Sequence, residues 1–153
     1  MDKTLITGKF AILAPVPEEH LLSWHKDGQE KKVAFGSMAF ELFRQADELR
    51  GERFVKVLIY ASLAEDRPLN SQVSWQGWYV AHVPSRSGRY PQGMKYRPPS
   101  TAGEKPTWAI FWEIEELEPL SSPIAIASLK GLGKKSNYPP RFTPEGPLLI
   151  EYR

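Results

Sequence analysis

Two segments of the chain gather basic and aromatic side chains in a pattern that suits contact with a polyanion. In residues 84–107, five cations are opposed by Glu104 alone, and residues 128–143 carry four cations and no carboxylate. Basic side chains attract phosphates, and tyrosines between them can stack on unpaired bases at about 1–3 kcal/mol per base. We therefore expect a nucleic-acid-binding surface made of Arg86, Arg89, Lys95, Arg97, Lys134, Lys135, Arg141, Trp78, Tyr90 and Tyr96.

The same pattern also fits a solvated loop whose tyrosines pack beneath prolines. Among the tryptophans, Trp75, Trp108 and Trp112 share the apolar phase of their expected strands and are predicted to lie in the core. Trp78 has the opposite phase and shares its strand face with His82. An exposed Trp there could stack on an extruded base or cover a helix.

Groups that could support catalysis or bind a metal are sparse. Glu113 and Glu115 share one strand face, a spacing compatible with paired carboxylates but more typical of a solvated acidic rim. Residues 131–136 only superficially resemble a phosphate loop, because Ser128 stands where the first Gly of the Walker pattern belongs. The absence of Cys excludes thiol catalysis, disulfides and cysteine-ligated zinc. We expect no catalytic residues, no cofactor and no metal site, since no metal-ligand spacing links His20, His25 and His82.

The length of 153 residues indicates a single domain over residues 1–153. A hydrophobic share of 41% and a charged share of 25% exclude a disordered tail, a collagen-like fibre and a disulfide-stapled miniprotein. The net charge of +2 indicates no global attraction to polyanions, but it averages two basic segments and an acidic stretch near Glu113. We expect no membrane segment, because no run approaches the roughly 18–20 apolar residues that a span needs. We also expect no signal peptide and a cytoplasmic protein, because Lys9 interrupts the apolar N-terminal stretch and no clear cleavage site follows.

Two helices are expected from local signals. The first starts at Pro17, whose ring suits a first helical turn, and it ends before Gly28. The second covers residues 37–50, with Ser37 as a cap and Gly51 at its end. Its apolar stripe at helical spacing is Met38, Leu42, Ala46 and Leu49, with Phe43 beside it.

Strands are expected at residues 4–13, 53–62, 73–83, 108–117 and 148–152. The strand over residues 53–62 is apolar on both faces, which is typical of an interior strand. Gly77 indicates a bulge or a close backbone approach. Pro119 and Pro123 are expected to end the strand before them. The proline-rich stretch over residues 84–107 is far longer than an ordinary connection of roughly 4–6 residues, and loops of that length are usually functional or disordered.

Three stretches resemble one superfamily in consistent order, over about residues 49–131. Residues 49–51 followed by 57–62 (Leu-Arg-Gly, then Val-Leu-Ile-Tyr-Ala-Ser) are similar to a helix end leading into a strand of ASCH-type domains. The strand at residues 73–83 resembles the barrel strand that follows. Residues 112–131, with Pro119-Leu120, Pro123-Ile124 and Lys130-Gly131, resemble the late strand and turn of ASCH and EVE domains, although the ASCH motif GxKxxExR is missing.

The resemblance implies a PUA-like fold, namely an α+β domain with a small, mostly antiparallel open β-barrel and flanking helices. It also implies recognition of RNA or a modified base. The expected function is thus a noncatalytic module that binds RNA or modified DNA, and convergence of both basic segments on one concave face would favour it strongly. A protein-interaction domain using the proline-rich loop is one alternative. A small nucleoside or amide hydrolase of ASCH type is another, and it requires a deep pocket with a Lys and a carboxylate.

Overall fold

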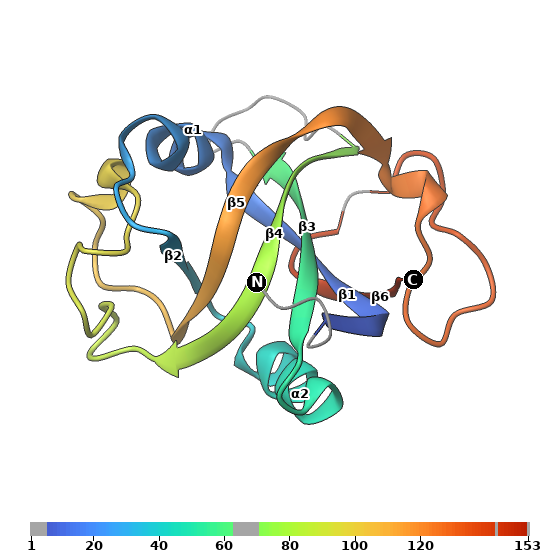
Figure 1. Cartoon of the computed structure of the whole chain (residues 1–153), viewed down its shortest axis with the longest axis horizontal. Helices are drawn as coiled ribbons and strands as arrows, with labels where there is room; N and C mark the ends of the chain where they lie inside the picture. Colours follow the sequence, from blue (N-terminus) through green and yellow to red (C-terminus); the bar gives the residue numbers. More distant parts are fainter. Residues whose placement is uncertain (1–5, 63–70, 143, 153) are drawn as a thin grey trace.

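A curved six-stranded sheet organises the chain (Figure 1). The structure is a computed structural model that describes residues 6–62, 71–142 and 144–152. The strand order is β2-β5-β4-β3-β1-β6, and β1 and β3 run parallel while the other neighbours are antiparallel. The elements are β1 (Ile6–Pro17), α1 (Glu18–Asp27), β2 (Lys32–Ser37), α2 (Phe40–Arg50), β3 (Phe54–Ser62), β4 (Gln72–Pro84), the 3₁₀ turn η2 (Pro99–Thr101), β5 (Ile110–Ala125), the 3₁₀ turn η3 (Ile126–Ser128) and β6 (Leu148–Glu151).

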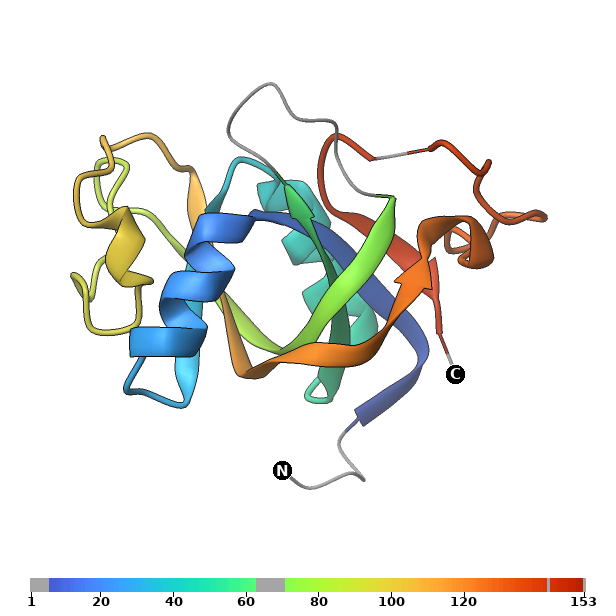
Figure 2. The same ribbon diagram turned by 90° about the horizontal axis from the view of Figure 1, so that it is seen from above.

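The expected class, α+β with a mostly antiparallel sheet, is confirmed. Within the described part of the chain the sheet is not closed into a barrel, because β2 and β6 stand at opposite ends of the strand order and do not pair. Figure 2 shows the strong curvature of the sheet, with α1 and α2 on different sides of it. None of the helices in the described residues is long and apolar enough to cross a membrane.

Strand β3 lies in the interior of the sheet, as its sequence predicts. Val57 and Ile59 belong to the main hydrophobic core, whereas Leu58 and Tyr60 on the other face belong to a second core beneath η3 and β6. All four side chains are buried. Strand β3 thus contributes side chains to both cores. Burying an aliphatic side chain of this kind stabilises a fold by about 1.5–3 kcal/mol.

Helix α2 begins later than its sequence predicts and buries a different face. Ser37 ends β2, where its hydroxyl accepts the backbone N–H of Ala39 at 3.0 Å, and the helix starts at Phe40. Phe43 and Ala46 form the buried face, and the Phe43 ring stacks on Trp112 with 5.4 Å between centroids. The expected stripe is wrong at its two ends, because Met38 is 60% exposed and Leu49 is 52% exposed.

Strand β5 continues through Pro119 and Pro123, which were expected to end it. Strand β2 pairs with β5 only over residues 110–115, so both prolines lie where one edge of β5 has no strand partner. Proline is tolerated at such an edge because no ladder hydrogen bond requires its missing N–H. The expected bulge at Gly77 is confirmed by a register shift between Gln76 and Trp78.

The remaining strand expectations hold with shifted bounds, apart from one strand that sequence reasoning missed. The first strand extends to Pro17, while its expected start at Thr4 lies outside the described residues. Strand β2 was not expected, because six residues beside a polar run give little periodic signal. It nevertheless carries Val33, Ala34 and Phe35 into the hydrophobic interior.

Candidate ligand-binding pocket

A pocket of about 410 Å³ opens in the gap where the sheet does not close. Its walls come from the end of β1, from β2, and from residues 145–147 just before β6, which are elements at or near the two ends of the sheet. The volume lies within the roughly 300–1,000 Å³ typical of small-molecule sites. The lining consists of residues 14–17, 35–39 and 145–147 together with His20, Ser62, Arg97, Glu104, Trp108 and Trp112.

Aromatic side chains form one wall of this pocket. Phe35 and Trp112 are buried, with 5.3 Å between their ring centroids, and Trp108 is half-buried beside them. Trp108 was expected in the core; it precedes β5, packs partly buried against the small core cluster of Ala34, Tyr90 and Phe111, and also lines the pocket. Its indole rests against the backbone of Gly36, where an added Cβ would come within 2.3 Å of the ring. The Trp108 indole can therefore pack against β2 only because Gly36 has no side chain.

An ion pair between the buried Arg97 and the partly exposed Glu104 fixes the carboxylate of the pocket. Glu104 Oε1 accepts hydrogen bonds from Trp108 Nε1 at 2.8 Å and from Arg97 Nη2 at 2.6 Å. Arg97 Nη1 donates to the carbonyl of Ala34 on β2 at 2.8 Å. Burial lowers the pKa of Arg97, and the Glu104 carboxylate opposes that shift. Among the described residues no group donates to Oε2 of Glu104, which leaves this oxygen as an acceptor for a ligand.

His20 on α1 supplies a second polar group to the pocket. Its Nδ1 lies 2.7 Å from the hydroxyl of Ser100 on η2, and the Ser100 backbone N–H donates to Ser23 Oγ at 2.9 Å. Burial lowers the pKa of His20, while Glu19 and Glu104 partly offset the shift and Arg97 adds to it. A lowered pKa favours the neutral ring at pH 7, so one nitrogen donates and the other accepts.

The pocket thus combines aromatic walls with acceptors and carries no excess of positive charge. The described lining contains two carboxylates, Glu104 and Glu145, and one guanidinium, that of Arg97. Such a cavity fits a planar ring that presents N–H donors. The described lining contains no lysine, so the pair of groups required by the hydrolase alternative is not assembled here. Within the described residues no group of three or more His, Asp or Glu side chains could hold a metal ion.

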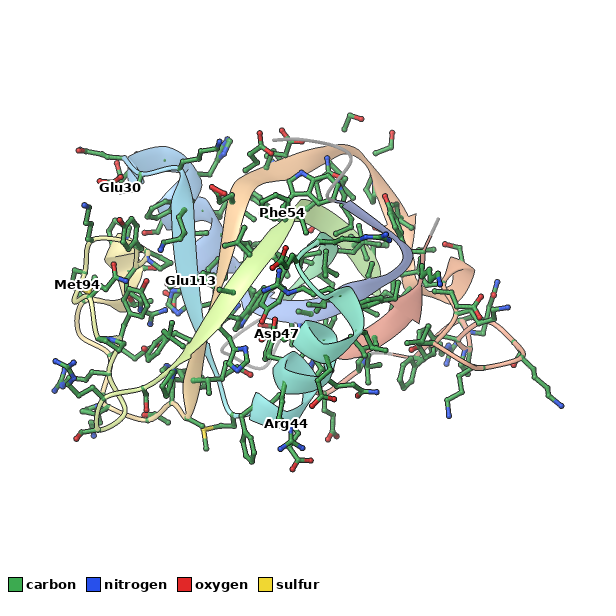
Figure 3. All side chains as sticks on the ribbon, turned by 60° about the horizontal axis from the view of Figure 1, so that its bottom comes forward. Glu30, Arg44, Asp47, Phe54, Met94 and Glu113 are labelled. Carbon is green, nitrogen blue, oxygen red and sulfur yellow. The ribbon has the colours of Figure 1, made fainter. Side chains whose placement is uncertain are left out.

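Two of the expected nucleic-acid contacts are instead buried in the fold. Arg97 is 6% exposed and bound to Glu104, and Tyr90, also 6% exposed, donates its hydroxyl to Glu113 Oε2 at 2.5 Å. Burial and Glu113 raise the pKa of Tyr90. Glu113 is 4% exposed and lies 3.4 Å from Lys32 Nζ, so the expectation of a solvated rim is wrong at this position. Figure 3 shows Glu113 on the side facing residues 84–107.

The other expected contacts lie at or near the surface. Arg86, Arg89, Lys95, Lys134, Lys135 and Arg141 are exposed. Tyr96 is half-buried, with Lys32 Nζ 4.3 Å and Lys95 Nζ 5.3 Å from the centre of its ring. Trp78 is half-buried too, and Lys56 Nζ lies 4.4 Å from its ring centre. Trp78 is not part of the pocket wall.

The predicted sharing of a face by Trp78 and His82 is wrong, because a register shift after Tyr79 changes the phase of β4. His82 turns with Tyr79 toward Asp47 of α2, which Figure 3 labels. Asp47 Oδ2 lies 2.8 Å from His82 Nδ1, and Oδ1 accepts from Tyr79 at 3.0 Å and from Arg50 Nε at 2.8 Å. This cluster ties α2 to the sheet, and no local motif predicts it.

The two basic segments lie at opposite edges of the sheet. Residues 84–107 cover the edge of β2, where Ala34 donates its N–H to the carbonyl of Tyr96 at 2.7 Å. Residues 128–142 cover the edge of β6, where Glu151 donates its N–H to the carbonyl of Lys130 at 2.9 Å. Figures 1 and 2 both place these segments at the two ends of the molecule. They do not form one concave basic face, which counts against a nucleic-acid surface made of both segments.

The pocket residues come from separate parts of the chain, so no sequence motif unites them. His20, Phe35, Glu104 and Trp108 were not expected to meet, and the only local signal was the length of the loop that brings Glu104 and Trp108 to the pocket. No protein-family model matches this chain, and no curated protein matches its sequence.

Proposed function

We propose that this domain binds an unpaired or extruded nucleic-acid base in the pocket between β1 and β2, as a noncatalytic recognition module. The observation that carries the proposal is the pairing of an aromatic wall with the fixed carboxylate of Glu104. A base offers a flat apolar face to such a wall, and the exocyclic amino groups of cytosine and adenine can donate to a carboxylate. The proposal includes a PUA-like relationship, which the curved, unclosed sheet with flanking helices supports.

Base recognition and backbone contact would be separate tasks in this arrangement. The pocket reads the base, and exposed cations of residues 84–107 contact the sugar–phosphate backbone. Arg86, Arg89 and Lys95 are exposed on the segment that also supplies Glu104 and Trp108. The cations at residues 128–142 lie at the other edge of the sheet, so they are not needed for the proposed contact. RNA and modified DNA remain the expected partners.

The test is a titration of single-stranded RNA and DNA oligonucleotides, followed by tryptophan fluorescence. We expect Trp108→Ala to weaken binding about tenfold or more, because stacking on an aromatic side chain contributes roughly 1–3 kcal/mol per base. Trp78→Ala is the matched control, since Trp78 is half-buried but outside the pocket, and it should leave affinity unchanged. Failure to bind any oligonucleotide, or equal effects of both substitutions, would contradict the proposal.

A glycine substitution tests the pocket without removing a contact group. In Gly36→Ala the new methyl group would come within 2.3 Å of the Trp108 indole, so the ring must move into the pocket or away from β2. We expect lost binding together with a destabilisation of about 1–3 kcal/mol from overpacking. Gly103→Ala is the control, because nothing lies within 4 Å of an added Cβ there. Normal binding by Gly36→Ala would show that the Trp108 position is irrelevant.

A protein-interaction function is the second candidate, favoured by apolar side chains at the pocket rim. Met38 lines the pocket and is 60% exposed, and Phe40 nearby in the chain is 49% exposed. Exposed apolar side chains of this size often mark partner surfaces. Co-purification of one protein that survives nuclease treatment, and that is lost in Met38→Ser, would favour this function over base binding.

A further inference from the structure

A second cavity, of about 170 Å³, lies inside the long loop and shares a wall with the pocket. Arg97 and Glu104 line both spaces, so one ion pair separates them. Arg89 and Lys105 line only the second cavity and are exposed. Neither cation has a carboxylate partner among the described residues, in contrast to Arg97, which is 2.6 Å from Glu104.

The two cavities differ in the sign of their charge. The pocket has two carboxylates, Glu104 and Glu145, against Arg97. The second cavity has three cations, Arg89, Arg97 and Lys105, against Glu104 alone. The ion pair between Arg97 and Glu104 largely cancels itself, so the remaining charge is negative on the pocket side and positive on the other. Neighbouring spaces of opposite sign suit a ligand whose adjoining parts also differ in charge.

The loop backbone brings the two unpaired cations together. Arg86 and Arg89 exchange backbone hydrogen bonds at 2.8 and 3.1 Å around a tight turn, in which Gly88 has a φ of +86°. An added Cβ at Gly88 would come within 2.8 Å of the Pro106 backbone, and the Gly88 carbonyl accepts the N–H of Thr107 at 3.3 Å. This close approach of the loop's two ends places Arg89 and Lys105 around one cavity.

We propose that the second cavity binds the phosphate of the nucleotide whose base occupies the pocket. The inference rests on the proposed function and adds the ligand class, a nucleotide recognised by base and phosphate together. A phosphate matches the cavity because Arg and Lys both bind phosphate oxygens, Arg through paired N–H donors and Lys as a point charge. The Glu104 carboxylate would repel a phosphate, but its ion pair with Arg97 offsets that repulsion and leaves the second cavity positive.

The test compares a nucleoside with its 5′- and 3′-monophosphates by calorimetry. We expect one monophosphate to bind about tenfold more tightly than the nucleoside, with an advantage that shrinks as salt rises. The double variant R89Q/K105Q should lose that advantage and retain nucleoside affinity. The control K134Q/K135Q makes the same change of charge at the other edge of the sheet and should behave as the unmodified protein. Circular dichroism checks that each variant is folded.

The outcomes separate this inference from the proposed function. Nucleoside binding without any gain from phosphate, or an equal loss in both double variants, overturns the phosphate site and leaves base recognition standing. If no nucleoside or oligonucleotide binds, inorganic phosphate is the second probe. NMR amide shifts at residues 89 and 105 on addition of phosphate, abolished in R89Q/K105Q, would then support an anion site in the second cavity and contradict base binding in the pocket. If phosphate causes no such shifts, both the anion site and base binding are contradicted.

Discussion

Residues 84–107 and 128–142 are similar in sequence and different in structure. Both are basic, both contain prolines and at least one tyrosine, and each covers one edge of the same sheet. The first segment buries Tyr90 and Arg97 beneath it and lines two cavities. The second keeps Lys134, Lys135 and Arg141 exposed and stacks Tyr138 on Phe142, with 4.7 Å between ring centroids.

The difference shows that a basic composition does not by itself define a binding surface. In the first segment some cations are structural, because Arg97 fastens the loop to Glu104 and to the β2 backbone. Others, such as Arg89, face a cavity and have no protein carboxylate to satisfy them within the described residues. Burial and partners therefore separate cations that stabilise the loop from cations that can meet a ligand.

The largest difference that we expect between the two segments is in how much a lost cation lowers the free energy of unfolding. Arg97→Ala leaves the Ala34 carbonyl without this donor and leaves Glu104 Oε1 with Trp108 Nε1 as its remaining donor among the described residues. Because the Glu104 side chain is 25% exposed, we expect a loss at the lower end of the about 3–5 kcal/mol that breaking a buried ion pair costs. Urea denaturation measures the loss of unfolding free energy. Lys134→Ala, in the second segment, should change that free energy by no more than about 0.5 kcal/mol. Equal losses in the two variants would show that cations anchor both segments equally, which would contradict a structural role confined to the first segment.

A smaller effect is expected from the tyrosines of the two segments. Tyr90→Phe removes the hydroxyl that donates to the buried Glu113 and should cost about 1–3 kcal/mol. Tyr138→Phe is the matched change in the second segment, where the described residues supply no hydrogen-bond partner for the hydroxyl. We expect little loss there. A similar cost for both substitutions, measured by thermal and urea unfolding, would contradict a special role for the Tyr90–Glu113 contact.

The Tyr90 contact also predicts a pH dependence. Burial raises the pKa of Tyr90, so its neutral form is retained in the folded state after the unfolded chain begins to ionise near pH 10. The stability that results is fully present below pH 10 and falls as the pH rises above it, by up to about 1.4 kcal/mol per pH unit. Tyr90→Phe should make the alkaline decline shallower. An unchanged slope between pH 10 and 11 would show that Tyr90 does not contribute to the decline.

The sequence predicted those parts of the fold that local patterns control. Alternation on two faces identified β3, and Gly77 marked its bulge in β4. Strand β2 escaped detection because distant residues hold it in place. It pairs with β5 over residues 110–115, and its Ala34 carbonyl accepts a hydrogen bond from Arg97, 63 positions away. The phase of β4 beyond Tyr79 was also lost, since an unanticipated register shift moved His82 to the other face.

The candidate site was harder to predict than the fold. The charge of Arg97 and the strand phase of Glu113 both indicated solvent exposure. Each residue is nevertheless buried, because an oppositely charged side chain lies beside it, Glu104 beside Arg97 and Lys32 beside Glu113. Charge patterns report how many cations a segment has, whereas burial depends on which carboxylates or carbonyls fold against them. The unusual length of residues 84–107 was the one sequence feature that pointed to a segment lining the candidate pocket.

The smallest expected effect is on the salt dependence of oligonucleotide binding, which should differ between variants of the two segments. This prediction rests on the proposed function. Binding of a single-stranded oligonucleotide should weaken as salt increases, with a log–log slope that falls by about 0.7 for each phosphate contact removed. Arg86→Gln and Arg89→Gln should each reduce the slope by that amount, because these cations lie on the segment that lines the pocket. Lys135→Gln and Arg141→Gln make the same change of charge at the opposite edge of the sheet and should leave the slope unaltered. The reverse result, with the slope set by Lys135 and Arg141, would move the backbone contact to residues 128–142 and separate it from the pocket, because a strand held there would run along the edge of β6 and not past Trp108 and Glu104.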